Sequence, residues 1–250
     1  MASTYNRKRP DGRANDALRP LEIIPGFAPY ADGSALIKCG DTHVLCTATI
    51  EDKVPPFLTG KGRGWVTAEY GMLPRSSPQR IPRERSLESG RTKEIQRMIG
   101  RSLRAVVDLR SLGERTILID CDVIQADGGT RTAGVTGGYV ALRQALGKLE
   151  RLKQVKALPL KGWLAAVSVG LVYGEIRLDL AYQEDSAADV DLNVVMNDRG
   201  LFVDMEFAAE GGQPIDLERL NAMLALAGQG IAELIRVQRA ALGMQVTVRS

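Results

Sequence analysis

Apolar and polar residues alternate with a period of two along three stretches of the first fifty positions, which predicts three strands. The stretches are residues 21–24, 34–38 and 44–50, and Gly33 and the pair Gly40–Asp41 supply the turns between them. Residues 1–20 are basic and polar and show no such period. We expect them to form an arm that becomes ordered against another structure.

The period of the apolar residues changes to 3.6 at residue 91, which predicts a helix capped by Ser89. Its apolar stripe consists of Ile95, Met98, Ile99, Leu103, Val106 and Val107. A loop rich in Pro, Gly and Arg, residues 55–88, precedes this helix and is interrupted by an alternating segment at 65–70. A further strand is predicted at 115–125, and a second helix from near Val135 to about Leu149.

The second half of the chain predicts four more strands and a long final helix. The strands are residues 164–173, 176–181, 190–196 and 201–207, and the helix is residues 217–242. Turn residues at 174–175 and 197–200 separate the paired strands. Because no break in composition divides the chain, we expect one α+β domain over residues 1–250.

The composition is that of an ordinary globular protein, with 44% hydrophobic and 25% charged residues among 250. No apolar run approaches the roughly 20 residues that a membrane span needs, and the N-terminus lacks the apolar core of a signal sequence. Cys39, Cys46 and Cys121 form no paired motif and lie in apolar contexts, so we expect buried thiols in a reducing compartment. These features predict a cytoplasmic protein without a membrane partner.

The single histidine, His43, limits the chemistry that the chain can perform. A Ser-His-Asp triad or a zinc site with several histidines would have to depend on this one residue, so both are almost excluded. Its place before an alternating strand favours a structural role over a catalytic one. Acid–base and metal chemistry is therefore expected from carboxylates.

The net charge of +3 hides a strong segregation of charge along the chain. Residues 61–104 hold eleven Lys and Arg against four Asp and Glu, whereas residues 179–216 hold ten Asp and Glu against one Arg. Such a surface suits a polyanion that is held by cations close to carboxylates that bind a metal. Two solvated faces of opposite charge would produce the same pattern.

Two segments combine anion donors with a predicted helix start. Ser89-Gly90-Arg91-Thr92 places an arginine beside free backbone amides, which is either a phosphate site or the capped end of a surface helix. Gly128-Gly129-Thr130-Arg131-Thr132 lets the backbone come close to a ligand and adds hydroxyl and guanidinium donors. It lacks the spacing of a P-loop and the third glycine of a dinucleotide fingerprint, and its Thr-Arg pair favours anion binding over a plain turn.

A third segment, residues 184–193, groups several carboxylates, which repel one another unless a cation neutralises them. Hard oxygen ligands favour Mg²⁺ or Mn²⁺, which proteins commonly share with substrate phosphates. A solvated acidic loop is the alternative interpretation. Taken together, the three segments make a consistent phosphate and metal site.

Four stretches, in this order, resemble the ribonuclease PH family of phosphate-dependent 3′→5′ exoribonucleases, which trim tRNA precursors. They are KVPPFLTGKGRGWVTAEYGMLPR, SGRTKEIQRMIGRSLRAVVDL, GERTILIDCDVIQADGGTRTAG and EDSAADVDLNVVM, and the resemblance covers nearly the whole chain. It implies a β-α-β-α core shared with polynucleotide phosphorylase and exosome ring subunits. It also implies a hexameric ring built as a trimer of dimers.

The resemblance assigns roles to particular residues. The family's phosphate-binding residues fall on Arg91, Gly129, Thr130 and Arg131, and its paired catalytic carboxylates fall on Asp185 and Asp191, which would hold Mg²⁺ or Mn²⁺. Arg97 and Arg101 are candidates for the RNA backbone, and residues 75–85 correspond to a loop that helps to assemble the ring. Inorganic phosphate, as co-substrate, would attack the terminal phosphodiester of an RNA with a single-stranded 3′ end and release nucleoside diphosphates.

One stretch departs from the family's pattern. Members usually read close to Glu-Val-Gln-Gly-Thr-Ala-Glu where this chain has residues 204–210, so that Glu206-Phe207-Ala208 replaces Gln-Gly-Thr. A Phe in place of Gly adds bulk and removes backbone freedom. Two alternatives therefore stand beside phosphorolysis: a catalytically weak or inactive RNA-binding ring subunit, and a metal nuclease that uses water in place of phosphate.

Overall fold

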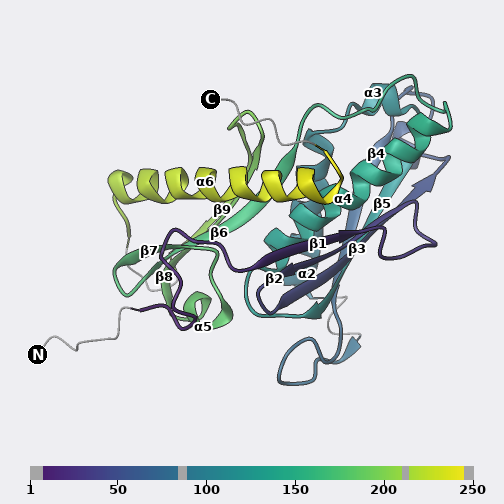
Figure 1. The fold of residues 1–250 in the computed structure, drawn as a ribbon. Helices are drawn as coiled ribbons and strands as arrows, with labels where there is room; N and C mark the ends of the chain where they lie inside the picture. Colours follow the sequence, from purple (N-terminus) through teal and green to yellow (C-terminus); the bar gives the residue numbers. More distant parts are fainter. Residues whose placement is uncertain (1–7, 84–88, 210–213, 245–250) are drawn as a thin grey trace, which may run out of the picture.

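The computed structural model describes residues 8–83, 89–209 and 214–244, which form two β-sheets and the helices around them (Figure 1). The sheets have the strand orders β1-β2-β3-β5-β4 and β7-β6-β8-β9. The strands are β1 (Leu21–Pro25), β2 (Gly33–Cys39), β3 (Thr42–Glu51), β4 (Trp65–Met72), β5 (Thr116–Gln125), β6 (Leu164–Val172), β7 (Glu175–Leu178), β8 (Ala188–Asn197) and β9 (Phe202–Ala208). The helices are α2 (Gly90–Ala105), α3 (Leu109–Leu112), α4 (Thr130–Arg151), α5 (Tyr182–Asp185) and α6 (Leu217–Ala241), with a 3-10 helix η1 at Pro56–Leu58. The predicted α+β fold class is confirmed.

Helix α4 lies between the two sheets and joins them through one hydrophobic core. It packs against β2 and β3 of the first sheet and against β6 of the second, while α2 covers β4. Its close approach to the first sheet requires Gly137, where a Cβ atom would lie 2.8 Å from Cγ2 of Ile37. Strand β6 is buried along its whole length because α4 and α6 both pack against it.

The apolar patterns of the sequence place most of these elements correctly. In α2, the predicted stripe residues Ile95, Met98 and Ile99 are buried. The Oγ atom of Ser89 accepts a hydrogen bond from the backbone amide of Thr92 at 3.0 Å. The predicted helix cap is therefore confirmed.

The structure corrects two predicted boundaries and adds three short helices. Helix α4 begins at Thr130, before the predicted start near Val135, because packing against both sheets stabilises a first turn rich in poor helix formers. Strand β7 ends at Leu178 and not at Ala181, because the left-handed φ of 54° at Asp179 turns the chain out of the sheet. The elements α3, α5 and η1 are too short to show a repeating apolar pattern, so the sequence does not predict them.

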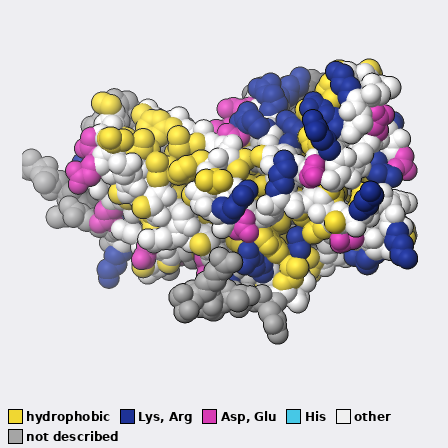
Figure 2. Space-filling view, turned by 90° about the horizontal axis from the view of Figure 1, so that it is seen from above, with side chains coloured by type: hydrophobic (Ala, Val, Ile, Leu, Met, Phe, Trp, Pro, Cys, Tyr) yellow, Lys and Arg dark blue, Asp and Glu magenta, His cyan; other side chains and the backbone are white. Residues whose placement is uncertain are grey.

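By length and mean apolar composition alone, helix α6 could cross a membrane, although polar residues interrupt its apolar run. Core helices of globular proteins share this length and composition, so these two properties do not indicate a membrane span. Met223, Ile231 and Leu234 are buried within the fold, whereas Leu217 and Ala225 are exposed. Figure 2 shows hydrophobic side chains gathered over α6 and Lys and Arg gathered over the other half of this face.

The described part of the N-terminal arm, residues 8–20, is ordered against the second half of its own chain. It runs past α5 and β7 before it enters β1 (Figure 1). Arg9 and Arg19 of this arm are buried. The arm thus belongs to the fold, and the contacts that hold it are described with the site below.

Candidate functional site

Tyr70, a buried residue of β4, brings the beginnings of α2 and α4 together. Its hydroxyl lies 2.8 Å from Oγ1 of Thr130, and its backbone carbonyl accepts a hydrogen bond from Nε2 of Gln96 at 3.4 Å. Burial raises the pKa of Tyr70, and the hydrogen bond to Thr130 and the charges of Arg91 and Arg131 offset part of that rise. Both guanidinium groups therefore lie within electrostatic reach of one hydroxyl.

The turn before α4 depends on two glycines, as the sequence predicts. Gly128 and Gly129 have φ angles of 73° and 65°, in the left-handed region that favours glycine. A Cβ atom on Gly128 would lie only 2.5 Å from the carbonyl oxygen of Leu180. Among the described residues no side chain caps α4 at Gly129, so the first-turn amides remain available to an anion.

A cleft of about 430 Å³ opens beside Tyr70 and the beginning of α2. Its lining includes Ser77, Arg80, Ser89 and Arg91. Arg80 lies in the loop 75–85 that the resemblance connects with ring assembly, of which residues 84 and 85 lie outside the described part of the chain. The cleft therefore sets a second cation beside Arg91, which the sequence alone did not single out.

Asp191 lies on β8, and the neighbouring strand β9 carries Glu206, the partner of Arg131. Oδ2 of Asp191 accepts a hydrogen bond from Nδ2 of Asn193 at 2.8 Å. Asn193 is paired in register with Glu206 of β9. Oε2 of Glu206 accepts a hydrogen bond from Nη1 of Arg131 at 2.5 Å. A short chain of neighbours thus links Asp191 to Arg131.

Asp185 ends α5, a single turn that rests on the glycine turn. The backbone amide of Tyr182 donates a hydrogen bond to Oδ1 of Asp127 at 3.1 Å, and the backbone at 180–182 is what a side chain at Gly128 would strike. Helix α5 leads directly into β8, which carries Asp191. The elements that carry Asp185 and Asp191 therefore lie against the glycine turn and β9, and the roles of these two residues stay predictions.

The two arginines proposed for the RNA backbone differ in their surroundings. Arg97 is exposed on α2. Arg101, one turn further along the same helix, donates a hydrogen bond from Nε to Oδ2 of Asp204 at 2.6 Å. Arg101 is thereby tied to β9.

The residues that depart from the family's pattern, 206–208, lie on both faces of β9. Successive residues of a strand point to opposite faces, so Glu206 and Phe207 cannot share one. Glu206 faces Arg131 of α4, and Phe207 is half exposed on the other side. The added bulk of Phe207 therefore points away from the phosphate turn, and the added charge of Glu206 points toward it.

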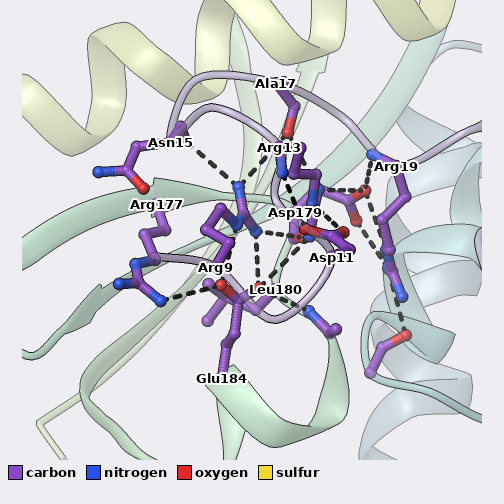
Figure 3. Close-up of polar contacts among 12 residues, drawn as sticks. Arg9, Asp11, Arg13, Asn15, Ala17, Arg19, Arg177, Asp179, Leu180 and Glu184 are labelled. Carbon is purple, nitrogen blue, oxygen red and sulfur yellow. Dashed lines mark hydrogen bonds and ion pairs between the residues drawn. The ribbon is translucent and has the colours of Figure 1, made fainter. Parts of the chain in front are cut away.

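A cluster of arginines behind α5 was not predicted from the sequence (Figure 3). Arg9 donates to both carboxylate oxygens of Glu184 at 2.9 and 2.7 Å, and Arg19 does the same to Asp179 at 3.0 and 2.7 Å. Nη1 of Arg177 reaches Glu184 at 3.1 Å. Burial alone would raise the pKa of both carboxyl groups, but the arginine contacts outweigh it and hold each pKa below its ordinary value.

Within the acidic segment, Glu184 has arginines of its own chain as counter-ions. The signal in the sequence was the cationic arm itself, because Arg9, Arg13 and Arg19 precede the first strand in a chain that is strongly acidic after residue 179. Distance in sequence concealed the pairing.

Asp185 and Asp191 offer the hard oxygen donors that Mg²⁺ prefers. Within the described residues no group of three or more His, Cys, Asp or Glu side chains is placed to hold a metal. A divalent ion at these two carboxylates would therefore need further oxygens from phosphate or water, which is how Mg²⁺ is usually held beside phosphate groups.

Comparisons with known proteins identify the family and the fold. Residues 17–146 match the sequence model of the 3′ exoribonuclease family, domain 1, and residues 162–230 match that of domain 2 of the same family. The crystal structure of rice (Oryza sativa) Rrp46 is similar, with a TM-score of 0.76 and 19% identity over 94% of this chain and 100% of that chain. The Archaeoglobus fulgidus exosome with RNA bound to the active site gives a TM-score of 0.75 and 25% identity over 94% and 93%. An archaeal exosome core gives 0.72 and 22% over 94% and 91%.

Proposed function

Because the chain belongs to the 3′ exoribonuclease family, we propose that it is a phosphorolytic 3′→5′ exoribonuclease. The observation that carries the proposal is the convergence of Arg91, Thr130 and Arg131 around Tyr70. Two guanidinium groups, a hydroxyl and the start of a long helix together suit one phosphate ion. A nuclease that used water would not need such a site, so the arrangement favours phosphate as the nucleophile.

In the proposed reaction, an oxygen of inorganic phosphate attacks the last phosphodiester of an RNA chain in line with the departing 3′-oxygen. The bond between phosphorus and that oxygen breaks, the oxygen takes up a proton, and a nucleoside diphosphate is released. Arg91 and Arg131 orient the phosphate and stabilise the charge of the transition state. Asp185 and Asp191 would hold Mg²⁺ or Mn²⁺, which would neutralise phosphate oxygens, and one of these carboxyl groups would assist proton transfer to the departing 3′-oxygen. The reverse reaction adds nucleotides.

We propose RNA with a single-stranded 3′ end, including tRNA precursors, as the substrate. An exosome structure with RNA at its active site is similar over most of both chains, which supports this class of substrate. Arg97 and Arg101 on α2 would follow the RNA backbone. Likeness to exosome structures also supports a ring, which we propose to be a homo-oligomer of six chains. The free thiols of Cys46 and Cys121 support a reducing, cytoplasmic location.

A second candidate function is a ring subunit that binds RNA with weak catalysis or none. The contact between Arg131 and Glu206 favours it, because a carboxylate holds the guanidinium that should bind phosphate. The two functions differ in the products they release from RNA and not in their fold.

One assay separates the candidates. RNA with a single-stranded 3′ tail is incubated with Mg²⁺, with and without phosphate, and the products are identified. We expect nucleoside diphosphates only when phosphate is present. Nucleoside monophosphates that form regardless of phosphate would overturn phosphorolysis. RNA that is bound but never shortened would favour the second candidate. The variant Arg110→Ala, on the exposed helix α3, serves as a control with unchanged turnover.

A further inference from the structure

We propose that Glu206 is a built-in competitor of phosphate: it holds Arg131 until phosphate displaces it, and so it determines the affinity of the site for phosphate. The inference rests on the proposed role of Arg131 as a phosphate ligand. It concerns a residue at which this chain departs from its family's usual neutral glutamine.

The geometry of the pair suits an exchangeable contact. Nη1 of Arg131 and Oε2 of Glu206 are 2.5 Å apart, and the two side chains are 19% and 20% exposed. The pair is therefore partly open to water. Because water can partly replace either partner, such a pair opens at a lower cost in free energy than a fully buried pair.

A second contact on the same strand has the same form. Asp204 lies two positions before Glu206, on the same face of β9, and accepts a hydrogen bond from Arg101 at 2.6 Å. Strand β9 is the edge of the second sheet and has β8 as its neighbour there. Its two carboxylates thus bind two of the arginines that are proposed to bind phosphate and RNA, and they occupy these arginines as a phosphate group would.

Phosphate that enters beside Arg131 meets a carboxylate of the same charge sign unless the side chain of Glu206 moves away. Only the fraction of the protein in which Arg131 is released from Glu206 then binds phosphate. If the pair holds Arg131 for about 90% of the time, the apparent affinity for phosphate is about tenfold weaker than the intrinsic affinity.

The test is the binding of inorganic phosphate to the full chain, without RNA, measured by isothermal titration calorimetry. Glu206→Gln keeps the shape of the side chain and removes its charge. We expect its dissociation constant for phosphate to be about tenfold lower than that of the unaltered protein. Glu233→Gln, the same change in an exposed ion pair on α6, is the matched control and should leave phosphate binding unchanged.

Two further variants make the outcome decisive. Glu206→Ala should show the same gain, and it decides the question if the glutamine variant fails to fold by circular dichroism. In an Arg131→Ala background, Glu206→Gln should give no gain. Unchanged phosphate binding in the folded Glu206 variants, or an equal gain without Arg131, would overturn the proposal.

The experiment also distinguishes this inference from the proposed function. A Glu206→Gln variant that binds phosphate more tightly but releases no nucleoside diphosphates from RNA would support the competitor and contradict phosphorolysis. Unchanged phosphate binding together with the release of nucleoside diphosphates would contradict only the competitor.

Discussion

Two of the places where arginines meet carboxylates in this fold differ in burial. Behind α5, the side chains of Arg9 and Glu184 are 1% and 2% exposed. On β9, Glu206 and its partner Arg131 are about ten times more exposed, at 20% and 19%. The first set of pairs is shut off from water, and the second is in contact with it.

Burial determines what each set can do. A buried pair stays closed, because opening it would leave charges without water or a partner. A pair that is partly open to water exchanges one anion for another at a lower cost. The buried pairs therefore hold the N-terminal arm against the segment that carries Asp185, while the pairs on β9 leave Arg101 and Arg131 accessible to a ligand. The same chemical groups serve structure in one place and exchange in the other.

The same carboxylate-to-amide change should have very different effects at the two places. Asp179→Asn leaves the buried Arg19 with only the more distant carboxylate of Asp127, at 3.9 Å, so we expect the free energy of unfolding to fall by about 3 kcal/mol. Glu206→Gln should change it by less than about 1 kcal/mol. Urea unfolding followed by circular dichroism at pH 7 measures both. Equal losses of unfolding free energy in the two variants would show that burial does not distinguish the two sets of ion pairs.

Removal of the exchangeable arginine should affect the reaction more than the fold. For Arg131→Ala we expect phosphate-dependent RNA degradation to slow by about 10²–10³-fold, because a donor to the transition state is lost. The free energy of unfolding should change by less than about 1 kcal/mol. Single-turnover assays and urea unfolding of the same preparation test the two statements. Unchanged turnover would remove Arg131 from the site.

Acid should weaken the buried pairs through their carboxylates. The pKa values of Asp179 and Glu184 lie below their ordinary values of 3.8 and 4.5 in the folded protein. Their contribution to stability is therefore complete above about pH 4.5 and is lost as the pH falls through the folded values.

Each such carboxylate adds about 1.4 kcal/mol per pH unit to the slope of the free energy of unfolding between its unfolded and folded pKa. We expect a shallower slope below pH 4.5 for Asp179→Asn than for the unaltered protein, measured by urea unfolding at several pH values. Glu206→Gln is the control, and equal slopes for all three proteins would contradict the buried network's role.

The smallest effect is expected at Tyr70, whose hydroxyl is hydrogen-bonded to Thr130, the neighbour of Arg131 in the chain. Tyr70→Phe keeps the packing of the ring and removes the hydroxyl that meets Thr130. We expect the free energy of unfolding to fall by about 1 kcal/mol. Thermal unfolding checks the stability, and phosphate calorimetry should show weaker binding because Thr130 loses its partner. A variant that matches the unaltered protein in both would show that Tyr70 does not position the turn.

Much of the fold could be predicted from local pattern. Alternation places β1 to β3, and a clear apolar stripe with a serine cap defines α2. The start of α4 could not be predicted in this way, because Thr130 to Gly138 is rich in residues that disfavour helices in isolation. Only the position of this segment between two sheets makes it helical.

The candidate site was predicted in part. Arg91, the 129–131 turn, Asp185 and Asp191 were assigned by resemblance; the structure brings Arg91 and Thr130 to Tyr70, while the roles of all these residues stay predictions. The sequence shows that Glu206 departs from the family's pattern, but it does not identify the partner of Glu206, because Arg131 lies 75 positions away. No local pattern in a sequence specifies which distant charge a carboxylate will meet.

The order in which the chain is synthesised gives the N-terminal arm one more property. Arg9 and Glu184 are separated by 175 positions, so the arm meets its partners only after the segment between them has been synthesised. Contacts between such distant positions form late in folding, because the loop between them must be closed first. The arm therefore docks after the strands and helices that lie between it and its partners have been translated.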